Sequence, residues 1–328
     1  MIQWKKSLLS GLVGSVLALG ASAVAAQAAP WPAQPIRIIV PFPAGGAGDL
    51  VPRILGERLS VTLGRPVIVE NKPGAEGAIG VNAVAKAKPD GYTLGVATSG
   101  PVVIGKRLFT SLPYDPKKDL APVGLTYETP FVLVVPASSP SHSLNELFKK
   151  VKENPGKLNI AIPNSGSVQH LLSEQMKNVA GLEILNIPYK GGGSAAVAVA
   201  GGEVDMTWAA LPNVINLIDA GKLRAIAVSG ARRDPKLANT PTVEEQGWPM
   251  LTSTNWNGLI APAGTPDAVL ERLNKEINAV MAEPATIKKF SDMGVSPLPG
   301  TRDDFIELMS KEEHKWAEVI KASNIQPL

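Results

Sequence analysis

Short apolar runs alternate with helical patterns along most of the chain. The run Ile36–Val40 is apolar on both faces apart from Arg37, which is typical of a strand buried in a parallel sheet. Pro41 and Pro43 end this run, and a glycine-rich loop then leads into a helical pattern near Leu50. The alternation of strand and helix recurs to about residue 228, and it predicts parallel sheets with helices on both faces.

The same two periodicities predict the remaining elements. Further strands are expected at 66–69, 92–97, 123–126, 131–135, 158–162, 183–188, 204–208 and 223–228. Helices are expected at 78–87, 145–152, 168–179, 212–220, 266–281 and 305–322, with one more, rich in alanine, that ends at 200. Residues 108–120 are rich in Pro, Asp and Lys and are expected to be irregular.

Three expected strands end in loops of glycine and small polar residues that open a helix, at 44–49, 164–167 and 190–194. A fourth loop, 98–100, offers hydroxyl groups. Ligands of open α/β sheets bind at the carboxyl ends of the strands, and helix N-termini there offer free N–H groups to anions. These loops therefore predict a site for a small carboxylate, although the same glycines also fit ordinary tight connections.

Most enzymatic and cofactor sites are excluded by what the sequence lacks. The chain has no cysteine, and its histidines (142, 170 and 314) lack metal-ligand spacing. Neither a nucleophile elbow nor a Walker sequence occurs. Gly191-x-Gly193-x-x-Ala196 matches a relaxed dinucleotide motif, but the first strand–helix unit lacks the motif and no acidic residue follows at the required distance. We therefore expect no catalytic residue, no metal and no cofactor.

The length is sufficient for two domains, and the charge content is that of a globular protein. The chain has 328 residues, of which 19% are charged, and its formal net charge is only +3. Lysine and arginine are scattered rather than clustered, so no nucleic-acid partner is expected.

The first 28 residues are expected to be a cleavable signal peptide. Lys5 and Lys6 precede an apolar stretch, Leu8–Leu19, and Ala26–Ala28 satisfies the small-x-small cleavage rule. Cleavage there would place the mature N-terminus near Ala29, with 24–26 as a competing site. The alternative is a membrane anchor, for which the stretch is short.

Eight short motifs occur in a fixed order from about Trp31 to the C-terminus. They are PIRIIVPFPAGG (35–46), VENKPGA (69–75), PDGYTL (89–94), LPYD (112–115), PYKG (188–191), GEVDM (202–206), AGKLRA (220–225) and APAGTP (261–266). Each motif alone is common. The ordered set resembles the periplasmic solute-binding proteins of the tripartite tricarboxylate transporter type, the Bug receptor family.

This resemblance implies a periplasmic-binding-protein-like α/β fold of two domains, each a mainly parallel sheet flanked by helices, with the ligand cleft between them. Domain one would comprise 31–127 plus 253–328, and domain two 128–252. The implied function is that of a monomeric periplasmic receptor, which delivers a di-, tri- or aromatic carboxylate to membrane transporter subunits. A secreted α/β enzyme acting on a carboxylated substrate and a soluble ligand sensor for a membrane receptor are the alternatives.

In the family, the loops that match 42–49 and 164–170 here grip one carboxylate, partly through waters. The resulting candidate ligand-binding residues are Phe42, Ala44, Gly45, Gly46, Ala47, Gly48, Asp49, Glu76, Ser99, Asn164, Ser165, Gly166, Ser167, Val168, Gln169, Tyr189, Lys190, Gly191 and Asp205. Tyr127-Glu128-Thr129 departs from the family pattern, and Trp208 and Trp256 are expected to narrow the pocket.

Several of these residues also have structural interpretations. Asp49 would repel an anion, and it is expected to pair with Arg53 one helical turn away. Lys190 either neutralises a second carboxylate or is simply solvated, and Tyr189 either donates its hydroxyl or packs. His170 is expected to pack on a helix face rather than to carry protons.

Overall fold

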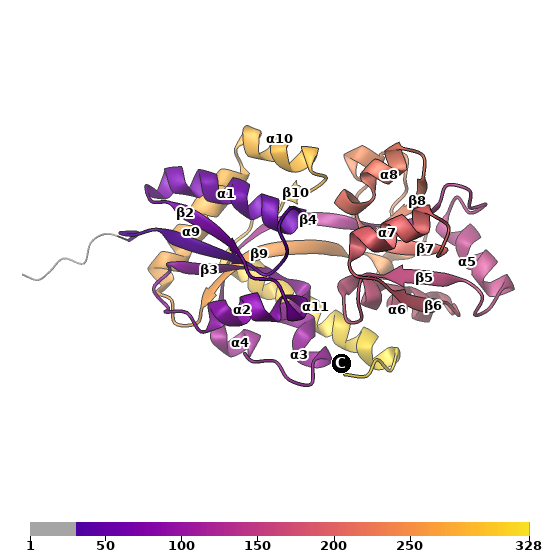
Figure 1. Ribbon diagram of the computed structural model, residues 1–328, viewed down its shortest axis with the longest axis horizontal. Coiled ribbons are helices and arrows are strands. Elements are labelled where there is room, and N and C mark those ends of the chain that lie inside the picture. Colours follow the sequence, from indigo (N-terminus) through magenta and orange to yellow (C-terminus); the bar gives the residue numbers. More distant parts are fainter. Residues whose placement is uncertain (1–30, 328) are drawn as a thin grey trace, which may run out of the picture.

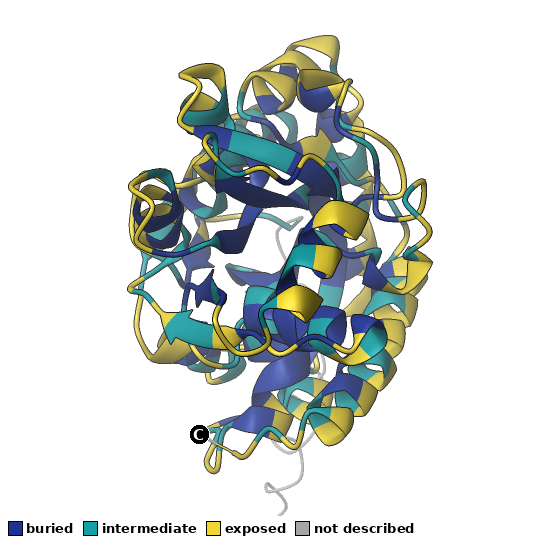
Figure 2. Ribbon diagram, turned by 90° about the vertical axis from the view of Figure 1, so that its right-hand side faces the viewer, coloured by how far each residue is buried: buried dark blue, intermediate teal, exposed yellow. Residues whose placement is uncertain are grey.

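A computed structural model describes residues 31–327, so the predicted signal peptide and its cleavage site lie outside the described residues. Ten strands form a mixed sheet with the order β2-β1-β3-β9-β4-β7-β5-β6, and β8 and β10 pair with β4. Helices pack on both sides of the strands (Figure 1), and the burial colouring shows the buried strands inside a more exposed helical layer (Figure 2). The predicted α/β fold class is confirmed.

The predicted helices and strands occur in the expected order along the chain. The strands are β1 Ile36–Val40, β2 Val67–Asn71, β3 Thr93–Thr98, β4 Leu120–Pro136, β5 Asn159–Ile162, β6 Leu185–Pro188, β7 Met206–Ala210, β8 Leu223–Val228, β9 Thr254–Pro262 and β10 Ser296–Pro297. The α-helices are α1 Ala47–Leu63, α2 Ala78–Ala85, α3 Gly105–Leu108, α4 Pro116–Asp119, α5 Leu144–Glu153, α6 Val168–Ala180, α7 Gly192–Ala200, α8 Ile215–Asp219, α9 Asp267–Met281, α10 Pro284–Asp292 and α11 Arg302–Ala322.

Two long strands, β4 and β9, connect the two halves of the sheet (Figure 1). The first half contains β1, β2, β3, β10 and the paired parts of β4 and β9. The second half contains β5 to β8 and the end of β4. Pairing is parallel among β1, β2 and β3 and among β5, β6 and β7, whereas β4 and β9 run antiparallel to their neighbours. The parallel pairing expected from the sequence therefore holds for the outer strands only.

The structure joins two expected strands into one. The pattern separated 123–126 from 131–135, but β4 is a single strand of 17 residues. Pro130 lies between the two stretches, where it pairs with the first residue of β9, and from Phe131 onward β4 pairs with β7 and β8 instead. Proline has no backbone N–H to donate to a neighbouring strand. Because Pro130 lies where β4 changes partner, its missing donor interrupts neither the pairing with β9 nor that with β7 and β8.

Two elements of nine residues each were missed. These are β9 and α10; two very short elements, α3 and β10, were also not predicted. The strand β9 contains two asparagines and a glycine, which are residues depleted in strands. The helix α1 begins at Ala47, three residues before the expected Leu50, so Pro52 lies in its second turn. The region 108–120 is irregular as predicted, apart from the single turn of α4.

Buried apolar side chains fix the base of the loop that follows β1. Ile38 and Val40 on β1 pack in one cluster with Leu55 and Leu59 of α1 and Leu273 of α9, all at most 1% exposed. Burial of such a side chain contributes roughly 1.5–3 kcal/mol, so this cluster holds β1 and α1 at a fixed distance. Within residues 31–327, no helix combines the length and apolar character needed to cross a membrane.

Candidate functional site

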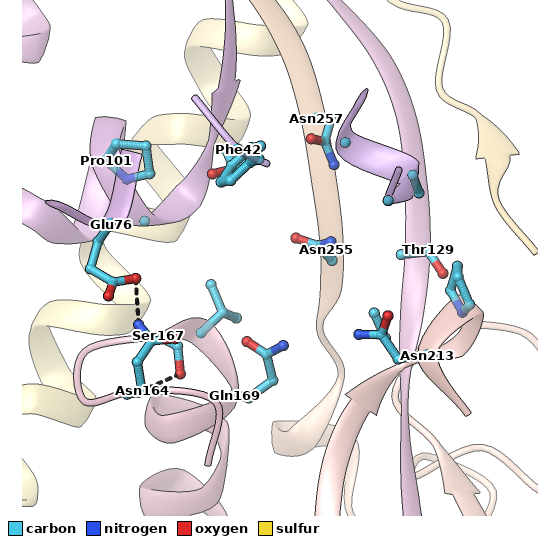
Figure 3. Close-up of a pocket in the computed structure, with 18 of the residues that line it drawn as sticks. Phe42, Glu76, Pro101, Thr129, Asn164, Ser167, Gln169, Asn213, Asn255 and Asn257 are labelled. Atoms are coloured by element: carbon cyan, nitrogen blue, oxygen red, sulfur yellow. Dashed lines mark hydrogen bonds between the residues drawn. The ribbon is translucent and has the colours of Figure 1, made fainter. Parts of the chain in front are cut away.

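A cavity of about 280 Å³ lies between the two halves of the sheet, at the carboxyl ends of β1, β3 and β5. Figure 3 shows its walls, with Glu76, Asn164 and Ser167 on one side and the asparagines of β9 on the other. Predicted candidates that line the cavity are Phe42, Gly46, Ala47, Gly48, Asp49, Glu76, Asn164, Gly166, Ser167, Val168 and Gln169. The structure thus brings together the two loops that the sequence singled out.

The N-terminus of α1 supplies backbone donors to this cavity. Gly46 is the N-cap residue, and no side chain caps the helix. The N–H groups of Ala47 and Gly48 belong to the first turn, where an α-helix has no internal acceptors. Gly46 has φ −87°, whereas its neighbour Gly45 has φ +100° and therefore depends on being glycine. A Cβ atom on Gly46 would meet no atom within 4 Å.

Asp49 stabilises this loop rather than offering itself to a ligand. Its carboxylate accepts hydrogen bonds from the Gly45 N–H at 3.0 Å, from Asn71 Nδ2 at 2.8 Å and from Arg53, whose nearest nitrogen lies 2.8 Å away. Burial alone would raise the pKa of Asp49, but these hydrogen bonds and the charge of Arg53 hold the pKa below its ordinary value. The predicted Asp49–Arg53 pair is confirmed. The Gly45 N–H is already bonded, so the free donors begin at Gly46.

The N-terminus of α6 faces the same cavity from the second half. Ser167 caps the helix by accepting a hydrogen bond from the His170 N–H at 3.1 Å, while its hydroxyl donates to the Asn164 carbonyl at 2.9 Å. This hydroxyl is therefore bonded locally. The N–H groups of Val168 and Gln169 lie in the first turn and lack internal acceptors. Two helix N-termini from different halves thus point donors at one cavity.

His170 supports the α6 loop as a neutral imidazole. Its Nδ1 accepts a hydrogen bond from the Gly166 N–H at 3.1 Å, which requires that nitrogen to be unprotonated. Burial lowers the pKa of His170, an effect that Glu174 opposes and Lys177 assists. The expectation that His170 packs rather than carries protons agrees with its 9% exposure and with these bonds.

The crossing strands form the third wall. Asn255 and Asn257 on β9 pair in register with Thr129 and Tyr127 on β4, so all four side chains share one face of the sheet. Burial raises the pKa of the Tyr127 phenol, which therefore keeps its proton as a possible donor. Trp256 alternates to the opposite face and is buried there, so the expectation that it narrows the pocket is wrong.

Glu76 projects into the cavity from the turn before α2. It has φ 53° and ψ 31°, a left-handed conformation that is uncommon outside glycine, and Ala75 before it has φ 45°. Its Oε2 accepts a hydrogen bond from Asn164 Nδ2 at 2.6 Å, which connects the two halves across the cavity (Figure 3). Glu76 is partly open to solvent, yet desolvation by the surrounding protein raises its pKa.

Some predicted residues do not line the cavity: Ala44, Gly45, Ser99, Ser165, Tyr189, Lys190, Gly191 and Asp205. Ser99 donates instead to Glu312 on α11 at 3.0 Å, and its neighbours Thr98 and Gly100 face the cavity. Asp205 accepts from the Asn159 N–H at 2.9 Å. That bond lies at the amino ends of β5 and β7, opposite the carboxyl ends where the cavity opens.

The third predicted loop does not line the cavity but adjoins it, since the Gly191 N–H donates to the carbonyl of Pro163, next to the lining residue Asn164, at 3.0 Å. Tyr189, Lys190 and Gly191 follow β6, the last strand in the sheet order and the neighbour of β5, whose carboxyl end borders the cavity. The sequence predicts that this loop follows a strand, but it does not predict that the strand is at an edge. Trp208 is fully buried and does not line the cavity either.

Sequence reasoning also missed several lining residues. These are Pro101, Phe109, Ala210, Pro212, Asn213, Asn255 and Asn257. The only signal for any of them is the alternation of Asn255 and Asn257, which places two amides on one face once residues 254–262 are recognised as a strand. The others lie at the end of β7 or in short helical and connecting segments, whose approach to the cavity depends on tertiary packing.

The lining has few ionisable groups and no arrangement typical of a nucleophile and its base. Asp49 and Glu76 are its acidic members, and no Lys, Arg or His lines the described cavity. The Ser167 hydroxyl donates to a backbone carbonyl rather than to the His170 imidazole. Among residues 31–327, no cluster of three or more metal-ligating side chains is present. Neutral donors dominate, which suits binding of an anion through hydrogen bonds.

Comparison with known proteins identifies the family. The sequence model of the tripartite tricarboxylate transporter family receptor matches residues 51–325. Protein BugT of Bordetella pertussis is 36% identical over 314 residues, which are 95% of this chain and 96% of BugT.

Two solved structures are similar along nearly their whole length. Rpa4515 of R. palustris, solved with adipate, has a TM-score of 0.82 and 32% identity, and the match covers 91% of this chain and 100% of that chain. MatC of Rhodopseudomonas palustris, with bound malate, has a TM-score of 0.77 and 30% identity, and the match covers 88% of this chain and 99% of MatC. The chain therefore belongs to the tripartite tricarboxylate transporter receptor family.

Proposed function

We propose that this protein is an extracytoplasmic receptor that binds a small organic carboxylate and delivers it to membrane transporter subunits. One observation carries the proposal. The N-termini of α1 and α6, from different halves of the sheet, present first-turn N–H groups to one cavity. A carboxylate held between them would accept hydrogen bonds from both helices and would be stabilised by both helix dipoles.

The family and the ligands of two relatives support this proposal. Adipate and malate, the molecules bound to Rpa4515 and MatC, are small carboxylates. We further propose the domain division predicted above, with 31–127 plus 253–328 and 128–252 as units that close on the ligand. Export by a cleavable signal peptide, action as a monomer and the absence of enzymatic activity belong to the same proposal. The local bonding of Ser167 and His170 supports the last point.

The proposal is tested by isothermal titration of the purified protein against a panel of mono-, di- and tricarboxylates. Each mixture is then analysed for turnover by mass spectrometry. We expect saturable binding of at least one carboxylate and recovery of that molecule unchanged. Binding only of uncharged compounds, or conversion of the bound carboxylate, would contradict the proposal. Mass spectrometry of the molecule that co-purifies with the protein would identify the natural ligand.

A further inference from the structure

The charge distribution around the cavity is unlike that expected for a receptor of dianions. Glu76 is the acidic side chain that remains open to a ligand, because Asp49 is 2% exposed and bonded to Arg53, Gly45 and Asn71. No basic side chain in the described lining would balance a second carboxylate. If one carboxylate of a dianion were held at the helix N-termini, its second carboxylate would lie in the same cavity as the negatively charged Glu76, with no basic side chain to balance it.

The backbone conformation of Glu76 places its carboxylate in the cavity wall. Non-glycine residues with positive φ cost free energy and are enriched at functional sites, and Ala75 and Glu76 both have positive φ. Oε2 of Glu76 accepts from Asn164, whereas Oε1 has no hydrogen-bond partner among residues 31–327. One carboxylate oxygen is thus an acceptor that a donor group on a ligand can use.

Asn257 provides a second, independent indication of a neutral polar ligand group. It is 1% exposed and lines the cavity, and neither its Nδ2 nor its Oδ1 has a partner in the described part of the chain. Buried polar atoms are nearly always hydrogen-bonded, so an amide without partners in a cavity wall indicates a ligand. A carboxylate would satisfy only the Nδ2 donor, whereas a group with both a donor and an acceptor would satisfy both atoms.

We propose that the ligand is a monocarboxylate whose second polar group carries a hydrogen-bond donor and no negative charge, with Glu76 and Asn257 as the specificity-determining residues. A primary amide fits both side chains, since it has N–H donors for Glu76 and a carbonyl that can accept from Asn257. A hydroxyl or an amine satisfies the Glu76 acceptor. The inference rests on the proposed function, because the carboxylate end must first be held by α1 and α6. It separates this chain from the relatives solved with adipate and malate.

The test compares ligands of equal length that differ in one group. Calorimetry at pH 7.5 measures the wild-type affinity for succinamate, succinate and butyrate, and for adipamate, adipate and hexanoate. We expect at least one monoamide to bind about tenfold or more tightly than its matched diacid. Glu76→Gln removes the charge with little change of shape, and it should raise diacid affinity about tenfold while leaving the unsubstituted monocarboxylate within about twofold.

Two further variants complete the design. Asn257→Leu should reduce the affinity of the monoamide toward that of the unsubstituted monocarboxylate. Glu128→Gln is the matched control, because Glu128 lies on β4 between two lining residues but outside the cavity lining, and it should change no ratio. Equal binding of diacid and monoamide to the wild type, with no effect of Glu76→Gln, would overturn this inference but leave the proposed function standing. If no carboxylate bound at all, both the proposed function and this inference would be wrong.

Discussion

Gly45 and Gly46 are neighbours in the loop after β1, but only Gly45 requires glycine for its backbone. Gly45 has φ +100°, whereas Gly46 has φ −87° and open space around its Cβ position. The sequence indicates a glycine-rich loop without showing which glycine has positive φ, because any of them could adopt it. A substitution at Gly45 therefore tests the need for positive φ, whereas a substitution at Gly46 tests the space available to the ligand.

Substitutions at the two glycines should have different effects. Gly45→Ala should destabilise the protein by about 1–2 kcal/mol, because alanine is strained at positive φ. Gly46→Val should leave the melting temperature near that of the wild type, since its side chain enters open space, but weaken carboxylate binding about tenfold or more by occupying the cavity. Thermal unfolding and calorimetry measure the two effects. A large loss of stability in Gly46→Val with normal binding would contradict this assignment.

His170 should make the stability of the protein depend on pH. Its pKa in the folded protein lies below the ordinary 6.5, so the unfolded chain binds more protons as the pH falls below that value. The free energy of unfolding should therefore decrease as the pH falls from 6.5 toward the folded pKa. Glu174 and Lys177, which also face the imidazole, remain in place in His170→Gln. Melting curves between pH 7 and pH 5 should show a shallower decline for this variant than for the wild type.

At the scale of elements, the sequence predicts what lies close along the chain. The strand–loop–helix units around Gly46 and Ser167 were predicted because strand, cap and helix are adjacent in sequence. Lys190 follows the same pattern, yet its loop lies at the edge of the sheet, and strand order depends on contacts between distant segments. Asn257 was missed for the related reason that β9 is stabilised by pairing with β3 and β4 rather than by its own composition.

The N-terminus of α6 offers an element-scale test with a matched control. Ser167→Ala removes the cap and the hydrogen bond to the Asn164 carbonyl, so it should cost about 1 kcal/mol of stability and also weaken binding. Ser143→Ala removes the equivalent cap of α5, where Ser143 accepts from the Glu146 N–H away from the cavity. It should cost similar stability and leave affinity unchanged. Equal losses of affinity in both variants would show that the effect is not local to the cavity.

At the scale of the whole molecule, the crossing strands have two roles. Thr129 on β4 and Asn255 on β9 line the cavity where β4 changes partner from β9 to β7 and β8. Bending at this position would change the distance between the N-termini of α1 and α6, because each helix is packed on its own half. We therefore propose that β4 between 127 and 130, which lines the ligand site, is also the hinge that controls its opening.

Ligand binding should accordingly close the molecule. A carboxylate that accepts hydrogen bonds from both helix N-termini interacts with more donors when the halves are close, so it shifts the population toward the closed state. Small-angle X-ray scattering should show a smaller radius of gyration when the wild type is saturated with a carboxylate that calorimetry has shown to bind. Gly46→Val at the same ligand concentration is the control, and its profile should stay that of the ligand-free protein. An unchanged wild-type profile at saturation would mean that the cavity is preformed, and the proposed hinge between 127 and 130 would then be wrong.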